Sequence, residues 1–288
     1  FSLDSNGVTV KCTGCVAGDT GIVGGQTYTA YGTASLTLKP KGDSDWNRVV
    51  TSLVTDTSDL FKNQATFNQD ISSWDTSNVT TMNSMFLDAS AFNQPLNNWD
   101  VSNVTDMRNM FGLTDGTNSN FNQPLNNWDV SSVTKTGLMF GTSGGIGTGD
   151  IRAFNQDIGD WDVSNVTDMG SMFKSAEQFN QDLSDWDVSS NTNFYNMFDR
   201  ASAYNNGGVS LSCWDTSNVT LMNYMFYQTP FSQDLSAWCV PLIASLQTGF
   251  SNLGGTNPTW GAACIGNSVV LSFSDVTKTF GDPNFTVT

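Results

Sequence analysis

Histidine is absent from the 288 residues of this chain, and basic residues are scarce, with 11 Lys and Arg against 27 Asp and Glu. Without histidine the chain cannot form a Ser-His-Asp triad, a Cys-His pair, an HExxH zinc site or an imidazole pH switch. The formal net charge of −16 argues against nucleic-acid binding, which needs a basic surface to displace counterions from phosphate. No apolar run approaches the roughly 20 residues of a membrane span. We therefore expect neither a nucleic-acid partner nor a membrane span in this chain.

Glutamate is almost absent as well, because Glu177 is the only one and the other 26 acidic residues are aspartate. Aspartate favours turns and helix caps, whereas glutamate populates helix interiors. The composition therefore indicates a turn-rich, acidic and soluble chain. The first residue is Phe1, without an initiator Met or a signal-like segment, so we expect a mature or excised piece of a longer protein.

Tryptophan recurs at nearly regular intervals of 25, 29, 33, 25, 28 and 24 residues. Similar text surrounds each of these residues, for example FNQDISSWDTSNVTTMNSMF at 67–86. A period in this range is typical of a solenoid, and we expect about eight coils. The longer intervals come from insertions at 112–120 and 141–153, which are rich in turn-forming residues and should emerge on one edge of the stack. The repeated residues are Trp74, Trp99, Trp128, Trp161, Trp186, Trp214 and Trp238.

Each repeat predicts one short strand, in which Trp186 and Val188 alternate with Asp185 and Asp187. Alternation with a period of two is the pattern of a strand with one buried face. The strands of successive coils should pair in parallel.

A helix of about two turns should follow each strand. Val104, Met107, Met110 and Phe111 stand at i, i+3, i+6 and i+7, the spacing of a helical stripe. The predicted fold is therefore an α/β repeat solenoid with one short parallel strand and one short helix per coil.

The two ends of the chain depart from the repeat. Residues 49–61 fit the template without its tryptophan, residues 246–250 resemble a weak final helix, and Trp260 is a displaced last tryptophan. Before residue 45, short strand-like runs alternate with glycine turns. We expect a β-rich N-terminal cap at 1–45, the solenoid with its C-terminal cap at 46–264, and a separate segment at 265–288.

Five cysteines favour an oxidising compartment over a metal site. Cys12 and Cys15 lack the second ligand pair of a zinc ribbon, so a local disulfide is expected. A bridge between Cys239 and Cys264 would close about 25 residues at the end of the solenoid and add on the order of 3 kcal/mol. Cys213 is then unpaired; the alternative is a bridge between Cys213 and Cys239.

The repeats closely resemble the BspA-like leucine-rich-repeat surface proteins of bacteria. Three of the copies read FNQDISSWDTSNVTTMNSMF, FNQDIGDWDVSNVTDMGSMF and FNQDLSDWDVSSNTNFYNMF, and the resemblance covers about residues 46–264. The tail VVLSFSDVTKTFGDPNFTVT at 269–288 is similar to the opening strands of MBG-type Ig-like modules. Together these resemblances imply a leucine-rich-repeat-like fold in a multidomain exported protein at the cell surface, with adhesion as its role. Pro95 and Pro124 depart from the repeat, which weakens the case for one uniform binding column.

The aspartate that follows each tryptophan is the sharpest candidate binding column. If the tryptophans face the core, these carboxylates face outward, one per coil. They could bind Ca²⁺ or attract a basic or polyhydroxylated partner; alternatively each accepts backbone N–H bonds in an Asx-turn, which we favour. A second column, Asp70, Asp157, Asp182 and Asp234, is interrupted by proline and favours the turn role. The first column is Asp75, Asp100, Asp129, Asp162, Asp187 and Asp215.

Other positions support weaker hypotheses. The inserted loops and Tyr195, Tyr224 and Tyr227 depart from the template, so they are candidates for partner contact. A repeated threonine column keeps binding to ice or to a crystal surface as a hypothesis, and the repeated NVT asparagines should hydrogen-bond between coils. No single acid differs from its copies as a catalytic nucleophile would. The two columns are Thr80, Thr105, Thr134, Thr167 and Thr220, and Asn78, Asn103, Asn165 and Asn218.

The sequence thus predicts a non-enzymatic, extracellular adhesion or interaction segment. Its expected partners are surface glycans, proteins of a host or neighbouring cell, and other modules of the same chain. No cofactor is expected apart from possible Ca²⁺. The alternatives are a structural stalk without a specific ligand and a polysaccharide-acting enzyme.

Overall fold

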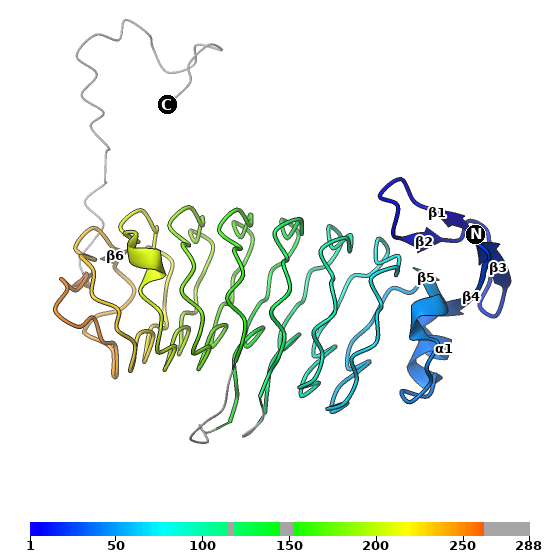
Figure 1. Ribbon diagram of the computed structural model, residues 1–288. Coiled ribbons are helices and arrows are strands. Elements are labelled where there is room, and N and C mark those ends of the chain that lie inside the picture. Colours follow the sequence, from blue (N-terminus) through cyan, green and yellow to red (C-terminus); the bar gives the residue numbers. More distant parts are fainter. Residues whose placement is uncertain (115–117, 145–151, 262–288) are drawn as a thin grey trace, which may run out of the picture.

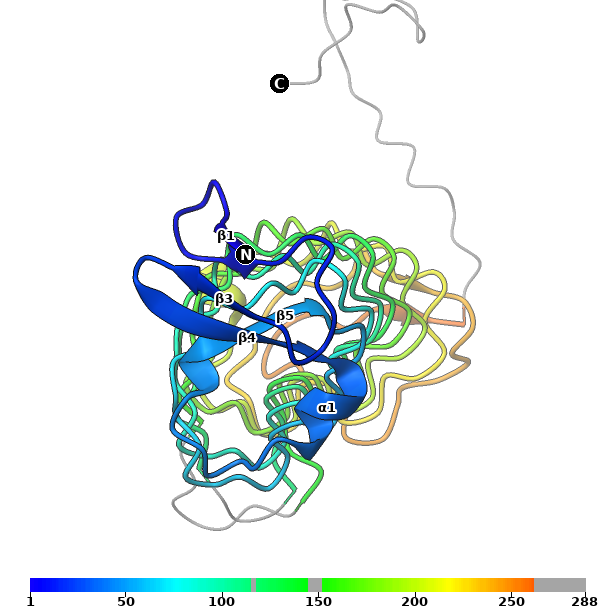
Figure 2. The same ribbon diagram turned by 90° about the vertical axis from the view of Figure 1, so that its right-hand side faces the viewer.

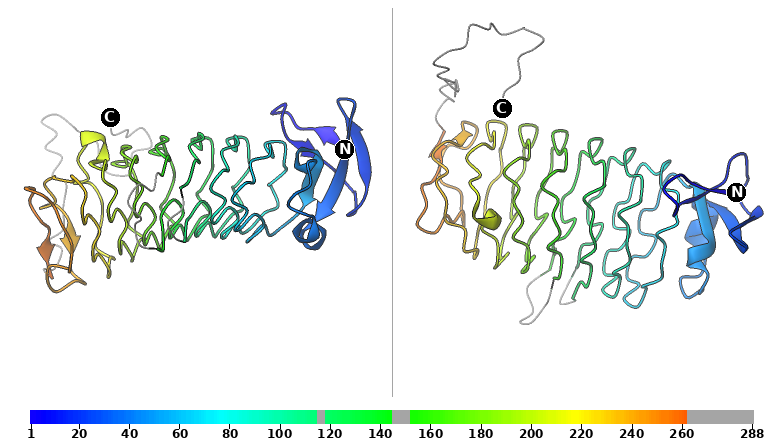
Figure 3. Two further views of the ribbon diagram at one scale, coloured as in Figure 1. Left: turned by 60° about the horizontal axis from the view of Figure 1, so that its bottom comes forward. Right: turned by 45° about the horizontal axis from the view of Figure 1, so that its top comes forward.

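The computed structural model describes residues 1–114, 118–144 and 152–261. In Figure 1 the chain winds into a row of coils that stack side by side, with a separate N-terminal unit at one end. Figure 2 looks along the row, so that the coils superpose around a common interior. Figure 3 shows the same row from two further sides.

The N-terminal unit consists of short strands and glycine turns, as the sequence predicts. β1 (Ser2–Leu3) pairs with β2 (Val10–Lys11), and β3 (Thr20–Val23) pairs with β4 (Gln26–Gly32), both antiparallel. Gly24 and Gly25 join β3 to β4 with φ values of +57° and +77°, the left-handed conformation that a two-residue type I′ turn needs. After α1 (Thr33–Leu38) and η1 (Trp46–Arg48), β5 (Val49–Leu53) pairs in parallel with β4.

A ladder of parallel bridges joins one residue of each coil to its counterpart in the next. Beyond the last bridge, the N–H of Tyr224 donates to the carbonyl of Thr248 at 2.9 Å, so the residues around Thr248 form an eighth coil. This number agrees with the roughly eight coils expected from the sequence. We call the surface of these segments, residues 56–63, 81–88, 106–113, 135–142, 168–175, 193–200 and 221–228, the bridge face. The bridged residues are Asp56, Thr81, Asp106, Lys135, Asp168, Asn193 and Leu221.

Along the bridge face, backbone N–H groups alternate between two kinds of acceptor. The N–H of Ser84 donates to the carbonyl of Arg108 in the next coil at 2.8 Å. The N–H of the following residue, Met85, donates to the carbonyl of Met82 in its own coil at 3.2 Å, which closes a β-turn. Each coil therefore combines inter-coil hydrogen bonds with consecutive turns.

The helix predicted for each coil does not form, and α1 is the only α-helix within the described ranges. In the segment of Val104, Met107 and Met110, Asn109 has a φ of +55°, and a left-handed residue interrupts a right-handed helix. The spacing of three arises because successive turns bring their first and fourth residues back to the core. The prediction of a leucine-rich-repeat-like α/β solenoid with a helix per coil is therefore wrong.

The strand predicted at each tryptophan is absent from the described coils of Trp74 to Trp214 and forms only in the last coil, directly after Trp238. The N–H of Trp186 closes a turn on the carbonyl of Leu183 at 3.2 Å, and the parallel bridges lie in the segment that follows. The alternating burial is nevertheless as predicted, because Trp186 and Val188 are buried whereas Asp187 is exposed. Alternation here reflects a bent, extended segment between two turns.

Stacked aromatic rings fill the core. In the coils from Phe61 to Phe226, the phenylalanine at the MF position stacks on the next buried ring of the chain, with centroids 3.8–4.1 Å apart. Phe111 and Phe121 keep a separation of 3.9 Å although the first insertion lies between them, so the insertion loops out of the coil. The MF rings also stack from coil to coil at 5.5–5.8 Å. Each buried ring of this kind stabilises the fold by roughly 1.5–3 kcal/mol through burial alone.

The repeated Asn-Gln pair forms a second inter-coil ladder, which the sequence analysis did not anticipate. The Oδ1 of Asn122 accepts the N–H of Asn155 and the side-chain amide of Gln156, both at 2.9 Å. Asn68, Asn93 and Asn155 accept the equivalent two bonds from their next coils. The tryptophans bond in the same direction, from the later coil to the preceding one, as in the 3.1 Å bond from Nε1 of Trp161 to the carbonyl of Leu125.

The last described coil contains β6 (Cys239–Val240) and β7 (Thr259–Trp260), which pair in parallel. Residues 246–250 form a turn, with Phe250 bonded to the carbonyl of Gln247 at 3.1 Å, so the predicted final helix is wrong. The remaining short helix is η2 (Asn206–Gly208). None of the helices in the described ranges has the length and apolar character of a bilayer span.

The cysteines follow the sequence prediction in part. Cys12 and Cys15 form a disulfide. Cys239 is disulfide-bonded whereas Cys213 is a free, exposed thiol, so the alternative pairing between these two is wrong. Cys264, the predicted partner of Cys239, and the predicted Ig-like segment at 265–288 lie outside the described residues.

A comparison of glycine and alanine at one bridge-face position distinguishes left-handed turns from a helix. Ser171 has a φ of +58°, so Ser171→Gly should be more stable than Ser171→Ala by about 0.5–1 kcal/mol. A helix would reverse this order by about 1 kcal/mol. Urea unfolding of the two variants measures the difference, and Ser132, whose φ is not positive, provides a control pair with alanine favoured over glycine.

Candidate functional site

Most aspartates that follow the tryptophans hold Asx-turns. The Oδ1 of Asp129 accepts the backbone N–H of Ser131 at 3.1 Å and the Ser131 hydroxyl at 2.6 Å. The other exposed members accept the N–H of the residue two positions later at 2.9–3.1 Å. The hydrogen bonds that an Asx-turn requires are therefore present at every exposed position of the column. Its exposed members are Asp100, Asp129, Asp162, Asp187 and Asp215.

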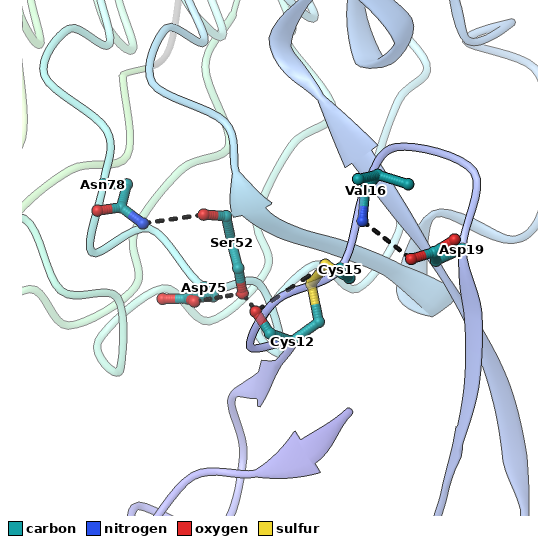
Figure 4. The surroundings of a disulfide bond; sticks show 7 residues. All are labelled: Cys12, Cys15, Val16, Asp19, Ser52, Asp75 and Asn78. Atoms are coloured by element: carbon teal, nitrogen blue, oxygen red, sulfur yellow. Dashed lines mark hydrogen bonds between the residues drawn. A yellow bond between two sulfur atoms is a disulfide. The ribbon is translucent and has the colours of Figure 1, made fainter.

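The repeat pattern predicts that Asp75, the first member of this column, faces outward, but the structure buries it. Only 4% of its surface is exposed, because the N-terminal unit covers it. In Figure 4 Ser52 of β5 lies between this carboxylate and the disulfide segment. The Ser52 hydroxyl donates to Asp75 and accepts the N–H of Cys12 at 3.1 Å. Asp75 thus links the N-terminal unit to the first coils.

The second aspartate column also holds turns and lines an open acidic depression between two coils. Asp157 and Asp182 accept the N–H groups of Gly159 and Ser184 at 3.0 and 2.9 Å. The depression is lined by these two carboxylates together with Gly159, Asp160 and Asp185. Across the described ranges, no three His, Cys, Asp or Glu side chains are grouped closely enough to hold a metal ion. Calcium binding by the aspartate columns stays a prediction, which calorimetric titration with Ca²⁺ would check.

The exposed threonine and asparagine columns bond from coil to coil. Each threonine hydroxyl, and that of Thr192, donates to the carbonyl of the threonine at the equivalent position of the preceding coil at 3.0–3.2 Å. The side-chain amides of Asn78, Asn103, Asn165 and Asn218 donate to carbonyls of the preceding coil at 2.8–2.9 Å. The predicted inter-coil role of these asparagines is confirmed. These uniform columns have a structural explanation that is independent of any ligand.

The two insertions lie side by side at one edge of the stack. Parallel bridges join Leu113 to Thr142 and Ser119 to Arg152. Asp88 of the preceding coil accepts the N–H and the hydroxyl of Thr114 at 2.8 and 2.6 Å. Residues 115–117 and 145–151 of the insertions lie outside the described ranges. The partner-binding role of these loops stays a prediction.

Five large side chains stand in two neighbouring segments of the bridge face, 193–200 and 221–228, and we call them the tyrosine patch: Tyr195, Arg200, Leu221, Tyr224 and Tyr227. Tyr195 and Leu221 are 43% and 45% exposed. Leu221 is the one apolar residue in the bridged column, and its bridge partner is Asn193. Sequence reasoning identified the three tyrosines but missed Leu221 and Arg200, which the same comparison with the template could have found.

The patch is organised by contacts between two neighbouring coils. The rings of Tyr224 and Tyr227 meet edge to face with centroids 5.6 Å apart. The guanidinium of Arg200 lies 5.9 Å from the centre of the Tyr227 ring, and its Nε donates to Gln228 at 3.2 Å. Arg200 N–H donates to the carbonyl of Tyr227, so the inter-coil ladder holds the two residues together.

Two patch residues adopt left-handed conformations that bulky side chains rarely take. Tyr224 and Arg200 have φ values of +57° and +61°. The equivalent positions in the adjoining coils carry Asn196 and Ser175, and asparagine adopts this conformation readily. A left-handed backbone costs roughly 1–2 kcal/mol for an ordinary residue. The large side chains at these positions therefore do not serve the local turn.

Beside the patch, burial raises the pKa of the Asp199 carboxyl, although Arg200 and Lys174 oppose the shift. The Nζ of Lys174 and the Nε of Arg200 each lie 3.8 Å from an oxygen of Asp199. Asp199 itself is 5% exposed. Two cationic side chains therefore flank one buried acid at the edge of the patch.

A protein-family model matches two consecutive parts of the chain, residues 34–148 and 147–260, and is described as Mycoplasma protein of unknown function, DUF285. The chain belongs to this family. Together the two DUF285 matches span the coils described above. No curated protein and no solved structure matches the chain. Because the family description assigns no activity, the function has to be argued from the geometry.

Asp162 provides a test of the turn role. Hydrogen bonds from the side chain and backbone of Ser164 lower the pKa of this carboxyl below 3.8. The charged acceptor therefore stabilises the fold above about pH 4, and this contribution is lost as pH falls through the lowered pKa. Asp162→Ala should cost about 0.5–1 kcal/mol at pH 7, and Asp162→Asn should cost less because it keeps an acceptor oxygen.

Urea unfolding at pH 7 and at about pH 3 measures these effects. The stability gap between the wild type and Asp162→Asn should shrink at the lower pH. A gap that is equal at both pH values would contradict the stabilising role of the ionised carboxylate.

Proposed function

We propose that this chain is a non-enzymatic adhesion segment of an exported cell-surface protein and that it binds glycans through the tyrosine patch. The observation that carries the proposal is the exposure of Tyr195 and Leu221 on the bridge face, because the five preceding segments, from 56–63 to 168–175, present no exposed large hydrophobic side chain. Tyrosine offers a flat apolar ring together with a polar hydroxyl. Such rings, with a few placed polar groups, are the usual lining of small-ligand sites.

The rigidity of the frame supports this proposal. The backbone of Tyr195 makes one bond between coils and one within its own coil: its carbonyl accepts the N–H of Ser171 at 2.7 Å, and its N–H donates to Oδ1 of Asn193 at 2.9 Å. Asn193 in turn donates to Asp168 at 2.8 Å. These bonds fix the backbone from which the tyrosine ring projects, so little backbone entropy is lost on binding, which favours affinity.

The size of the patch favours a glycan over a protein. A stable protein interface needs about 800 Å² from each partner and 20–30 residues. Here the exposed apolar side chains come from two neighbouring coils, and the surrounding positions are Asn193, Asn196, Asn223 and Gln228. Amide side chains beside aromatic rings suit a polyhydroxylated ligand, whose hydroxyls both donate and accept hydrogen bonds.

A structural spacer is the second candidate function. It is favoured by the threonine and asparagine columns, whose exposed polar groups are used in bonds between coils. The two functions make different predictions for a glycan array, because a spacer binds no sugar. Enzymatic action on polysaccharides has no comparable support, since the repeated acids hold turns.

The patch variants are chosen so that the fold tolerates them. Leu221→Asn and Tyr195→Asn introduce residues that the template already carries at the same positions, Asn193 and Asn223. On a glycan array, the double variant should lose at least about tenfold of the binding signal, because one buried ring contact is worth about 1.4 kcal/mol or more.

The matched control is Val209→Ser, which removes an exposed apolar side chain of similar exposure, 43%, elsewhere on the molecule. This variant should bind as the wild type does. Equal binding by the Leu221→Asn, Tyr195→Asn double variant would show that the patch is not the site. A wild-type chain that binds no sugar on the array would favour the spacer.

A further inference from the structure

The tyrosine patch has an unsaturated cationic group at its edge. Arg200 uses Nε to bond Gln228 at 3.2 Å, and its two terminal NH₂ groups make no hydrogen bond with any residue in the described ranges. The side chain is 34% exposed. Four N–H donors beside the ring of Tyr227 are therefore without an acceptor among the described residues.

Asp199 pairs with Arg200 through Nε alone, which leaves the two terminal NH₂ groups without an acidic partner in the described ranges. Asp199 lies 3.8 Å from Nε, beyond hydrogen-bond distance, and shares its charge with Lys174 at the same separation. Burial also raises the pKa of Asp199, which disfavours its charged form. Asp168, the other acid of the bridge-face segments 168–175, 193–200 and 221–228, accepts bonds from Asn193 and from the N–H of Gly170.

The overall charge of −16 does not decide the local potential. At physiological ionic strength the screening length is about 8 Å, so acids on distant coils act weakly at Arg200. Within the segments 168–175, 193–200 and 221–228 the cations Lys174 and Arg200 balance the acids Asp168 and Asp199. Because Asp199 is buried and Asp168 is hydrogen-bonded, the surface beside Tyr227 presents the guanidinium.

We infer that the tyrosine patch binds a sugar that carries an anionic group, with the sugar ring on the tyrosines and the anionic oxygens on Arg200. A guanidinium offers paired N–H donors that match a carboxylate or a sulfate, and its packing on Tyr227 orients the fork before binding. The inference rests on the proposed glycan-binding function and specifies the ligand class of the same site.

The experiment compares matched oligosaccharides by calorimetric titration of the full chain. The probes are an oligogalacturonate, a neutral galactose oligomer of equal length, and a sulfated galactose oligomer. The acidic probes should bind about tenfold more tightly than the neutral one, as a charge-assisted bidentate contact implies. Comparison of the carboxylated and sulfated probes shows which anionic group the site prefers.

Arg200→Gln is the decisive variant, because Gln228 occupies the same position in the next coil with a φ of +57°. It should lower the affinity for the acidic probes about tenfold and so abolish their advantage over the neutral probe. Lys135→Gln is the control, since it removes another exposed cation of the bridge face and should leave the preference intact.

The outcomes separate the two proposals. If the neutral and acidic probes bind equally and Arg200→Gln changes neither affinity, the anionic preference is overturned and glycan binding stands. If Lys135→Gln reduces the preference as much as Arg200→Gln does, the preference comes from the overall charge of the surface, and the assignment to Arg200 is wrong. If no probe binds at all, both this inference and the proposed function fail.

Discussion

The left-handed turn on the bridge face is the constraint on which the rest of the structure depends. It allows alternate N–H groups to leave their own coil and reach the carbonyls of the next, as Ser84 does with Arg108. The remaining N–H groups close turns, so the segment satisfies its backbone without a helix. The turns also return every third side chain to the core, and this supplies the aromatic rings that stack along the row.

The repeat period, the buried Trp and Phe positions, the looped insertions and the Asx-turns could all be predicted from the sequence. They depend on local chemistry that recurs in every copy, as at Asp129 and Ser131. The helix prediction failed because apolar residues at i, i+3 and i+6 fit consecutive turns as well as a helix. The residue types at the third turn position, Asp59, Ser84 and Asn109, offered a signal for left-handed backbone, but Leu138 and Tyr224 at the same position obscured it.

The candidate site was only partly predictable for a different reason. Asp75 belongs to a repeated column, yet its burial depends on Ser52 and on the N-terminal unit, which lies outside the repeat. The tyrosines were recognisable as departures from the template. The place of Arg200 in the candidate site follows only from its contacts with Tyr227 and Asp199 in space. The repeat predicts the features that all coils share. The surface chemistry of a single coil depends on the residues that contact it in the folded chain.

The inter-coil hydrogen bonds are constant along the row, whereas the side chains of the bridge face vary. The frame consists of bonds that are nearly identical in each coil, such as those of Asn122 with Asn155 and Gln156. The bridge-face side chains vary from coil to coil, from Lys135 through Asn193 to Leu221. Variation on a constant frame allows a surface to change its chemistry without a cost to the core.

The identity of the inter-coil bonds also has a consequence for how such a molecule can change its length. A coil that is duplicated or deleted as a unit offers its neighbours the same donors and acceptors, so the row can gain or lose one repeat without leaving backbone groups unpaired. Each added coil would move the tyrosines about 4.8 Å further from the N-terminal unit. Recombination between near-identical repeats of the gene could thus adjust the reach of the patch in steps of one coil.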